Sequence, residues 1–250
     1  MKGIIFDRGK SLNWYAFLIG AGASLAIWRI VQGQKKEEDF QWALAGLWVL
    51  VGAWLGARLA YFIWHPAAIV DIGWQALGLR EGGMVWPGAV FGTWITIIIL
   101  ALARRSNWLV VADRLLVMLP PLAIMAWLAG WISGSGYGTV VQAAWWVPRT
   151  LDDSFQLLPR FPLQWLAAAS LFLIFLLSEV RFPPKKTGAQ AALIWTVFSV
   201  HTLVFSLLRA DLRPEWLGVF WDIWFLIMCL VWAIIWNWIV FFKKASQEQV

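Results

Sequence analysis

Apolar residues fall into seven long runs along the chain, each bounded by polar or charged residues. A helix needs about 20 predominantly apolar residues to cross the hydrocarbon core of a bilayer, and these runs have that length. No domain boundary or repeat is visible, so the pattern predicts a single all-α domain over residues 1–250 with seven membrane-spanning helices. Their expected bounds are Asn13–Val31, Phe40–Trp64, Met84–Ala103, Ala112–Ile132, Leu163–Val180, Gly188–Leu208 and Trp216–Phe242.

Composition agrees with a membrane protein. Hydrophobic residues make up 61% of the 250 residues and charged residues only 14%, whereas a soluble domain carries about 25% charged residues. The net charge of +6 is typical of spans flanked by Lys and Arg and does not indicate nucleic acid as a partner. The chain has one cysteine, Cys229, and no metal-ligand spacing. We therefore expect no internal disulfide, no metal and no cofactor.

The distribution of Lys and Arg predicts an orientation. Seven spans place the two ends of the chain on opposite sides of the membrane. Basic residues cluster more tightly on the C-terminal side, among them Lys35, Lys36, Arg104, Arg105 and Lys243. Because such residues favour the cytoplasm, we expect the C-terminus inside and the N-terminus outside.

Tryptophan is unusually frequent, with 22 residues. Many lie near the ends of the apolar runs, where an amphipathic ring favours the membrane interface. Others, such as Trp54 and Trp232, lie in the middle of a run. Interfacial anchoring explains most of them, and an aromatic-lined pocket for a lipid tail, a quinone or a pigment is the alternative.

A glycine-rich stretch, residues 80–92, leads into the third run. Pro87 suits the first turn of a helix, where its missing N–H is not needed. Gly88 and Gly92 give that helix a smooth face that another helix can approach. A bent polar segment is tolerated in a membrane where it lines a cavity, although an ordinary loop before a packing helix accounts for the same residues.

Arg58 lies inside the second span, several residues before its end. A charge within a span marks a candidate functional site, although a long side chain can also reach the nearby interface. Gly52, Gly56 and Ala60 form a row of small residues that permits close helix packing. Glu81 is the expected ion-pair partner of Arg58, because an unpaired buried charge is costly.

The sixth span carries a polar stripe. Ser199, Thr202, Ser206 and Arg209 share one helix face by their spacing. The stripe can bind a polar head group at the outer surface, or its hydroxyl groups can hydrogen-bond between helices. His201 lies off this stripe and is more typical of a structural hydrogen-bond donor than of a catalytic base.

Two further features are expected on the outer side. The glycine-rich segment 133–138 is typical of a backbone nest for an anion, or of a flexible turn. Asp222 lies about a turn and a half from the outer end of the last span, at an interfacial depth.

Taken in order, these residues resemble the motifs of the prolipoprotein diacylglyceryl transferases, over most of the chain and at low identity. The similar stretches are Trp14-Tyr15, Gly56-Ala57-Arg58-Leu59-Ala60-Tyr61, Glu81-Gly82-Gly83-Met84 followed by Gly88 and Gly92, Phe161-Pro162-Leu163-Gln164, and Arg209. The resemblance implies a multi-pass protein of the bacterial plasma (inner) membrane. It also implies a lipid-binding site formed by Tyr15, Arg58, Glu81, Gly82, Gly83, Gln164 and Arg209.

The departures from the family pattern concern its chemistry. Where the family has a histidine, an arginine, an asparagine, a glutamate and a second arginine, this chain has Pro87, Trp127, Gly130, Ser135 and Thr202. In the family these groups are thought to hold phosphatidylglycerol and to assist transfer of its diacylglyceryl group to a cysteine thiol. That transfer needs charge stabilisation and a proton acceptor. The remaining catalytic candidates are Arg58, Glu81 and His201.

Three functions are compatible with the sequence. The chain is an active transferase with a rearranged site, an inactive relative that keeps a phospholipid cavity as a structural or lipid-anchoring subunit of a larger complex, or an unrelated seven-span transporter. The ordered motifs and the lack of paired intramembrane acids disfavour the transporter. The replaced groups favour the inactive relative. Expected partners are an anionic phospholipid such as phosphatidylglycerol, and a prolipoprotein substrate or complex subunits.

Overall fold

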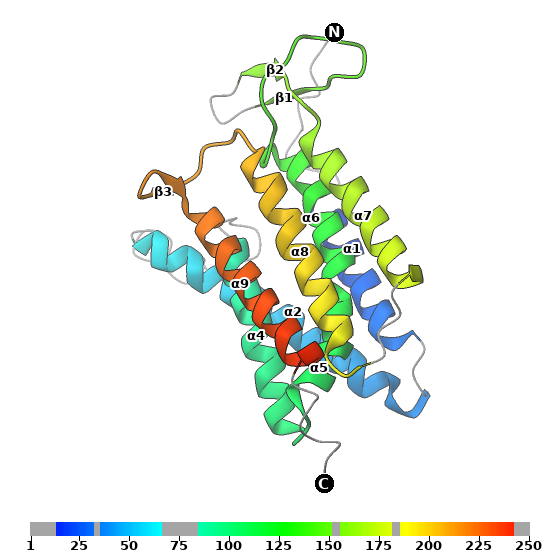
Figure 1. Ribbon diagram of the computed structural model, residues 1–250. Helices are drawn as coiled ribbons and strands as arrows, with labels where there is room; N and C mark the ends of the chain where they lie inside the picture. Colours follow the sequence, from blue (N-terminus) through cyan, green and yellow to red (C-terminus); the bar gives the residue numbers. More distant parts are fainter. Residues whose placement is uncertain (1–13, 33–35, 67–84, 152–155, 182–185, 243–250) are drawn as a thin grey trace.

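The computed structural model describes residues 14–32, 36–66, 85–151, 156–181 and 186–242, and within them the protein is mostly helical (Figure 1). The helices are α1 (Trp14–Val31), α2 (Lys36–Trp64), α4 (Trp86–Ala103), α5 (Trp108–Leu115), the short 3₁₀ helix η2 (Leu116–Met118), α6 (Leu119–Ser133), α7 (Leu163–Arg181), α8 (Ala189–Leu207) and α9 (Trp221–Phe242). Two antiparallel hairpins pair β1 (Arg149–Leu151) with β2 (Leu157–Pro159), and β3 (Glu215–Trp216) with β4 (Val219–Phe220).

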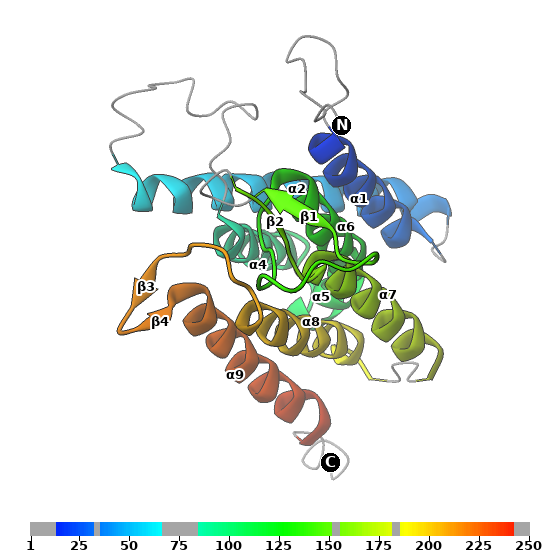
Figure 2. The same ribbon diagram turned by 90° about the horizontal axis from the view of Figure 1, so that it is seen from above.

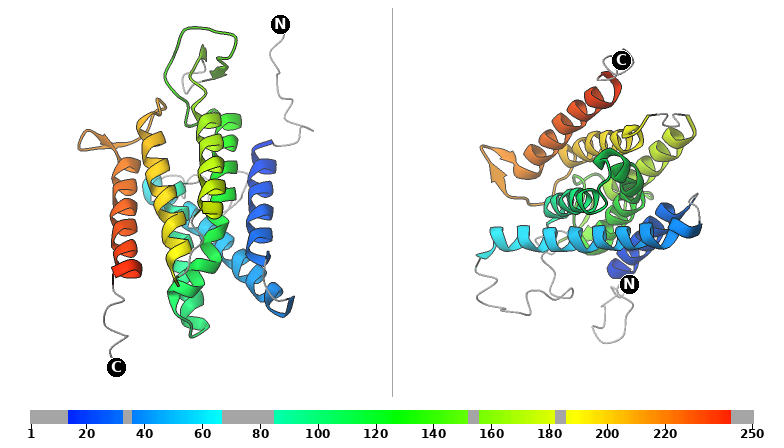
Figure 3. Two further views of the ribbon diagram at one scale, coloured as in Figure 1. Left: turned by 45° about the vertical axis from the view of Figure 1, so that its right-hand side comes forward. Right: turned by 90° about the horizontal axis from the view of Figure 1, so that it is seen from below.

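The predicted class of a multi-span helical membrane protein is confirmed. In the described part of the chain, six helical segments are long and apolar enough to cross a membrane. The expected fifth span coincides with α7, whose apolar stretch Leu163–Ser178 is shorter. Helix α1 begins and α9 ends at opposite ends of the bundle (Figure 3). The count of seven spans and the orientation remain predictions.

The expected start of the last span was wrong. Apolar residues continue from Trp216 onward, yet the chain forms the β3–β4 hairpin before α9 begins at Trp221. Leu217 and Gly218 make the turn at positive φ, 55° and 73°, which is the backbone of a two-residue hairpin loop. The backbone N–H of Trp221 donates to the carbonyl oxygen of Pro214 at 3.1 Å and closes the hairpin.

Helices α2 and α4 touch through their backbones. The rows of small residues predict a close helix neighbour for each of them, and the structure shows that they are each other's neighbour. A Cβ atom added to Gly56 would overlap the carbonyl oxygen of Gly88, and one added to Gly92 would overlap that of Gly52. Helix α2 runs obliquely across one side of the bundle (Figure 2), so this contact fixes where its end lies beside the start of α4.

We expect Gly92→Ala to lower the unfolding midpoint of the detergent-solubilised protein, because the added methyl group meets backbone that cannot rotate away. Overpacking of this kind costs about 1–3 kcal/mol. Gly20→Ala on α1 is the matched control, since a Cβ there meets nothing within 4 Å. Equal midpoints for the two variants in a thermal unfolding assay would show that α2 and α4 are not in backbone contact.

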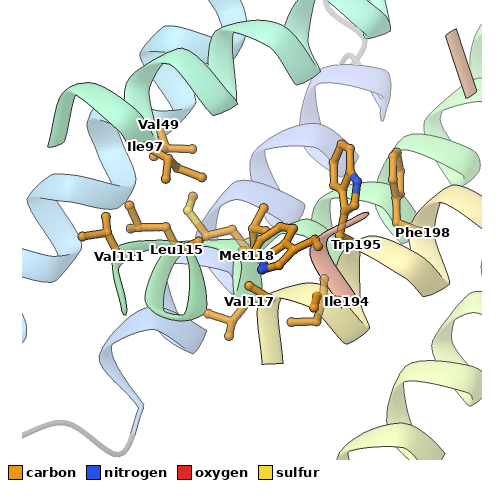
Figure 4. Packing of buried hydrophobic residues seen from close by; sticks show 14 of the residues in the cluster. Val49, Ile97, Val111, Leu115, Val117, Met118, Ile194, Trp195 and Phe198 are labelled. Carbon is orange, nitrogen blue, oxygen red and sulfur yellow. The ribbon is translucent and has the colours of Figure 1, made fainter. Parts of the chain in front are cut away.

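The hydrophobic core lies where α4, α5, η2 and α8 meet. Figure 4 shows its buried side chains, among them Ile97, Leu115, Met118 and Trp195. Tryptophans from the interiors of α4, α8 and α9, and one from the first residue of α5, extend this core by packing on one another, with ring centroids 5.2 to 6.4 Å apart. This group comprises Trp94, Trp108, Trp195, Trp232 and Trp236. Aromatic packing, rather than interfacial anchoring, therefore accounts for the tryptophans in the middle of these spans.

Candidate functional site

A polar cavity of about 340 Å³ lies between the end of α2, the start of α4 and the segment that joins α8 to α9. Figures 1 and 2 show these elements converging near the β3–β4 hairpin. The residues that line the cavity are Tyr61, Trp64, His65, Val85, Trp86, Arg209, Arg213, Pro214, Trp221 and Asp222. The wall is therefore mainly aromatic, with two guanidinium groups and one carboxylate.

Arg209 is held in place by Asp211. Its Nε donates to Oδ1 of Asp211 at 2.9 Å and its Nη2 donates to Oδ2 at 2.5 Å, a two-pronged geometry that orients the guanidinium plane. The same Oδ2 accepts the backbone N–H of Gly136 at 3.2 Å, and Ala210 N–H donates to the carbonyl oxygen of Tyr137 at 2.8 Å. The glycine-rich segment 133–138 thus contacts an anion, and the anion is this internal carboxylate.

Arg213 forms a second ion pair, with Asp222. Its Nη1 donates to Oδ2 of Asp222 at 2.8 Å, and Ser206 Oγ donates to that oxygen at 3.2 Å. Arg209 Nη1 lies 3.7 Å from the same oxygen. The Arg213 guanidinium also stacks on Phe220, with its Cζ 4.0 Å from the ring centroid. Asp222 lies in the first turn of α9 and is buried among protein side chains, with 2% of its surface exposed; its interfacial depth remains a prediction.

The four charged groups form a balanced cluster. Arg209 and Arg213 contribute two positive charges, and Asp211 and Asp222 contribute two negative charges. Arg213 was absent from the sequence-based candidates because its pairing depends on the unforeseen hairpin, which folds the chain back toward the start of α9. Little in the sequence pointed to Arg213, which stands four residues after Arg209 and directly before Pro214.

A larger, apolar cavity of about 610 Å³ adjoins the polar one, and the two share Trp64, Val85, Pro214 and Trp221 as walls. Its further lining includes Ile63 on α2, Phe91 on α4, and Trp224, Phe225 and Met228 on α9. Both volumes lie in the range of about 300–1,000 Å³ that is usual for ligand pockets. Together they form a groove, which we call the amphipathic groove, with one charged end and one apolar end.

The structure brings only part of the expected lipid site to this groove. Arg209 lines the polar cavity, whereas Arg58 is buried in α2 with 2% of its surface exposed and lines neither cavity. Tyr15 is 39% exposed on α1. Gln164 is buried at the start of α7, where its Nε2 donates to the carbonyl oxygen of Ser135 at 3.0 Å. Roles for these three residues in lipid binding remain predictions.

The other catalytic and lipid-site candidates do not line the amphipathic groove in the described part of the chain. Glu81, Gly82 and Gly83 lie outside the described residues. His201 packs between α7 and α8, with its Nε2 2.9 Å from Ser170 Oγ, and its ring stacks on Phe205 at 4.4 Å. A hydrogen bond between helices agrees with the structural role expected for this histidine.

The positions that depart from the family pattern serve packing and capping here. Trp127 lies against Phe205 with ring centroids 5.9 Å apart, and Thr202 is buried on α8. The carbonyl oxygen of Gly130 accepts the N–H of Ser135 at 2.9 Å where α6 ends. The fifth position, Pro87, is buried in the first turn of α4, as its ring geometry favours.

The helical bundle is that of a multi-pass membrane protein, and two adjoining cavities, one with charged lining and one mainly apolar, open beside α9. The family model of prolipoprotein diacylglyceryl transferase matches residues 3–242. The chain belongs to this family, which confirms the resemblance seen in the motifs, and it is a multi-pass protein of the bacterial plasma (inner) membrane.

Similar proteins carry the name phosphatidylglycerol–prolipoprotein diacylglyceryl transferase. The protein from Mannheimia succiniciproducens is 25% identical over 215 residues, which cover 82% of this chain and 79% of the relative. That from Burkholderia multivorans is 26% identical over 222 residues, covering 73% and 74%. For the protein from Cereibacter sphaeroides, 28% identity extends over 155 residues, 57% of this chain and about half (52%) of the relative.

Proposed function

We propose that this protein is a phospholipid-binding relative of the diacylglyceryl transferases with weak or no transfer activity. The amphipathic groove is the observation that carries the proposal. A phospholipid has a charged head and two apolar chains, and the groove has a charged end that continues into an apolar end. Its large apolar lining is open to the hydrocarbon of a surrounding membrane, because Ile63, Phe91 and Met228 are all more than half exposed.

The head group would lie in the polar cavity. A guanidinium group offers a planar set of donors that matches phosphate oxygens, and the cavity wall presents two of them, Arg209 and Arg213. The acyl chains would follow the apolar cavity between α4 and α9, where Phe91, Phe225 and Met228 form the wall. Removing apolar chains from the bilayer costs little when the groove surface is equally apolar.

Weak transfer is supported by what occupies the family's polar positions. Proline, tryptophan and threonine stand at residues 87, 127 and 202, and these side chains are packed into the bundle. None of them is a base or carries a positive charge. A site without these groups retains a lipid more readily than it transfers part of one.

The groove is tested with a phospholipid that carries a photoreactive group near the end of an acyl chain. After irradiation in a bilayer, mass spectrometry should find the label on peptides from the starts of α4 and α9. Met228→Trp places bulk in the apolar cavity and should reduce the label severalfold, because the chain loses its space. Ile234→Trp is the matched control, since Ile234 is an exposed apolar residue on the same helix that lines neither cavity.

The control variant Ile234→Trp should carry the same amount of photolabel, on the same peptides, as the unmodified protein. Labelling spread evenly over the lipid-exposed helices, with no effect of Met228→Trp, would contradict a phospholipid site in the groove.

A further inference from the structure

The charge balance of the polar cavity determines which head group suits it. Arg209 and Arg213 are each already paired with a carboxylate, so the described cluster is formally neutral before any ligand binds. An added anionic head group would leave one uncompensated negative charge among buried groups, which is unfavourable where water is scarce. A head group that brings its own positive charge leaves the balance unchanged.

The rest of the cavity wall has the composition that recognises an organic cation. Tyr61, Trp64, Trp86 and Trp221 line the cavity, together with His65. The rings of Trp64 and Trp221 meet edge to face, 3.8 Å between centroids at 73°, and so form a corner of the wall. Aromatic faces attract ammonium groups through the ring quadrupole, and quaternary ammonium ligands are bound by such walls.

Asp222 supplies the complementary charge within the same cavity. Its Oδ2 accepts hydrogen bonds from Arg213 and Ser206, while its Oδ1 is buried without a hydrogen-bond partner among the described residues. A buried carboxylate oxygen without a hydrogen-bond partner lowers the stability of the fold unless a donor or a cation reaches it. The wall therefore offers guanidinium groups for a phosphate, and aromatic rings with a carboxylate for a cation.

We propose that the polar cavity selects a zwitterionic phospholipid head group, a phosphate joined to an ammonium, over an anionic one. The phosphate lies against Arg209 and Arg213, and the ammonium lies among the aromatic side chains beside Asp222. This inference rests on the proposed phospholipid site, and it names the lipid class. An anionic head group, which the sequence led us to expect, is the competing outcome.

The test uses the full-length protein in nanodiscs that contain equal amounts of phosphatidylglycerol, phosphatidylethanolamine and phosphatidylcholine with identical acyl chains. Lipids retained after transfer to mild detergent are quantified by mass spectrometry and normalised to the disc composition. We expect the two zwitterionic lipids to be enriched about tenfold over phosphatidylglycerol, the ratio that corresponds to 1.4 kcal/mol. Equal retention, or enrichment of phosphatidylglycerol, would overturn the inference while leaving a phospholipid site in place.

Two variants separate the charge from the aromatic contribution. Asp222→Asn leaves the cluster with one excess positive charge, so retention should shift toward phosphatidylglycerol. Trp64→Leu keeps every charge but removes part of the aromatic wall, so phosphatidylcholine should lose its enrichment. Trp48→Leu is the control, because Trp48 is an exposed tryptophan on the same helix that lines neither cavity.

Each outcome decides one claim. If Asp222→Asn fails to fold in a thermal unfolding assay, the Trp64→Leu variant decides the selectivity. A folded Asp222→Asn or Trp64→Leu protein that keeps the original lipid preference would overturn the inference. If retention of every lipid class equals that of the groove-filling Met228→Trp variant, the proposed phospholipid site itself is wrong.

Discussion

Incubated with phosphatidylglycerol and a peptide that carries a lipobox cysteine, the purified protein should form little or no thioether product above the uncatalysed background. Attack by the thiol needs a proton acceptor and groups that stabilise developing charge. Loss of one such preorganised group lowers the rate by about 10²–10³-fold, and this chain has Pro87, Trp127 and Thr202 at three family positions. Losses within one cooperative site do not add, but they leave little activity.

Mass spectrometry of the peptide measures this result, with the Mannheimia succiniciproducens relative assayed beside it as the positive reference. Robust product that disappears in Arg58→Ala or Glu81→Ala would refute the inactive assignment. It would also identify those residues as the basis of a rebuilt catalytic site.

The second large effect is expected from Asp211, which joins its own segment to the loop that follows α6. Asp211→Ala removes the partner of Arg209 and the acceptor of the Gly136 N–H. Breaking a buried ion pair from one side costs about 3–5 kcal/mol, and Arg209 would keep only its longer 3.7 Å approach to Asp222, which already pairs with Arg213. We therefore expect a large drop in the unfolding midpoint, measured by tryptophan fluorescence in detergent.

Two further variants show whether the ion pair is the cause. Glu215→Ala removes an exposed carboxylate four residues away and should leave the midpoint nearly unchanged. Adding Arg209→Met to Asp211→Ala removes the orphaned charge and should recover part of the lost stability. A midpoint for Asp211→Ala equal to that of the unmodified protein would contradict the buried network.

The spans could be predicted from sequence because the length and hydropathy of a run are local properties. That α2 and α4 each present a face for close packing was also foreseeable, since Gly52, Gly56, Gly88 and Gly92 recur at the spacing that clears one helix face. These features depend on short stretches of sequence, whereas the pairing of these two helices with each other came from the structure.

The charged site could not be predicted in the same way. The β3–β4 turn lies within an apolar run, so composition gave no reason to begin the last helix only at Trp221. Once Leu217 and Gly218 adopt positive φ, Arg213 comes back within reach of Asp222. A change of backbone direction thus created the ion pair, and hydropathy carries no information about it. Arg209 was found because it belongs to a family motif, whereas Arg213 belongs to none of the motifs that we recognised.

The hydrogen bond between Gly136 and Asp211 connects the wall of the polar cavity to the loop that follows α6. Asp211 holds Arg209 with both of its carboxylate oxygens, and its Oδ2 also accepts the backbone N–H of Gly136. The carbonyl oxygen of Tyr137 accepts the N–H of Ala210. In the proposed site, a phosphate bound by Arg209 would compete with Asp211 for the same guanidinium group, and Asp211 is the acceptor of the Gly136 N–H. Coupling between two binding sites is reciprocal. If lipid binding in the cavity changes the affinity of the loop for a second molecule, that molecule changes the affinity of the cavity for the lipid by the same factor. If the cavity binds a lipid as proposed, binding at this loop and lipid occupancy of the cavity are expected to be coupled equilibria.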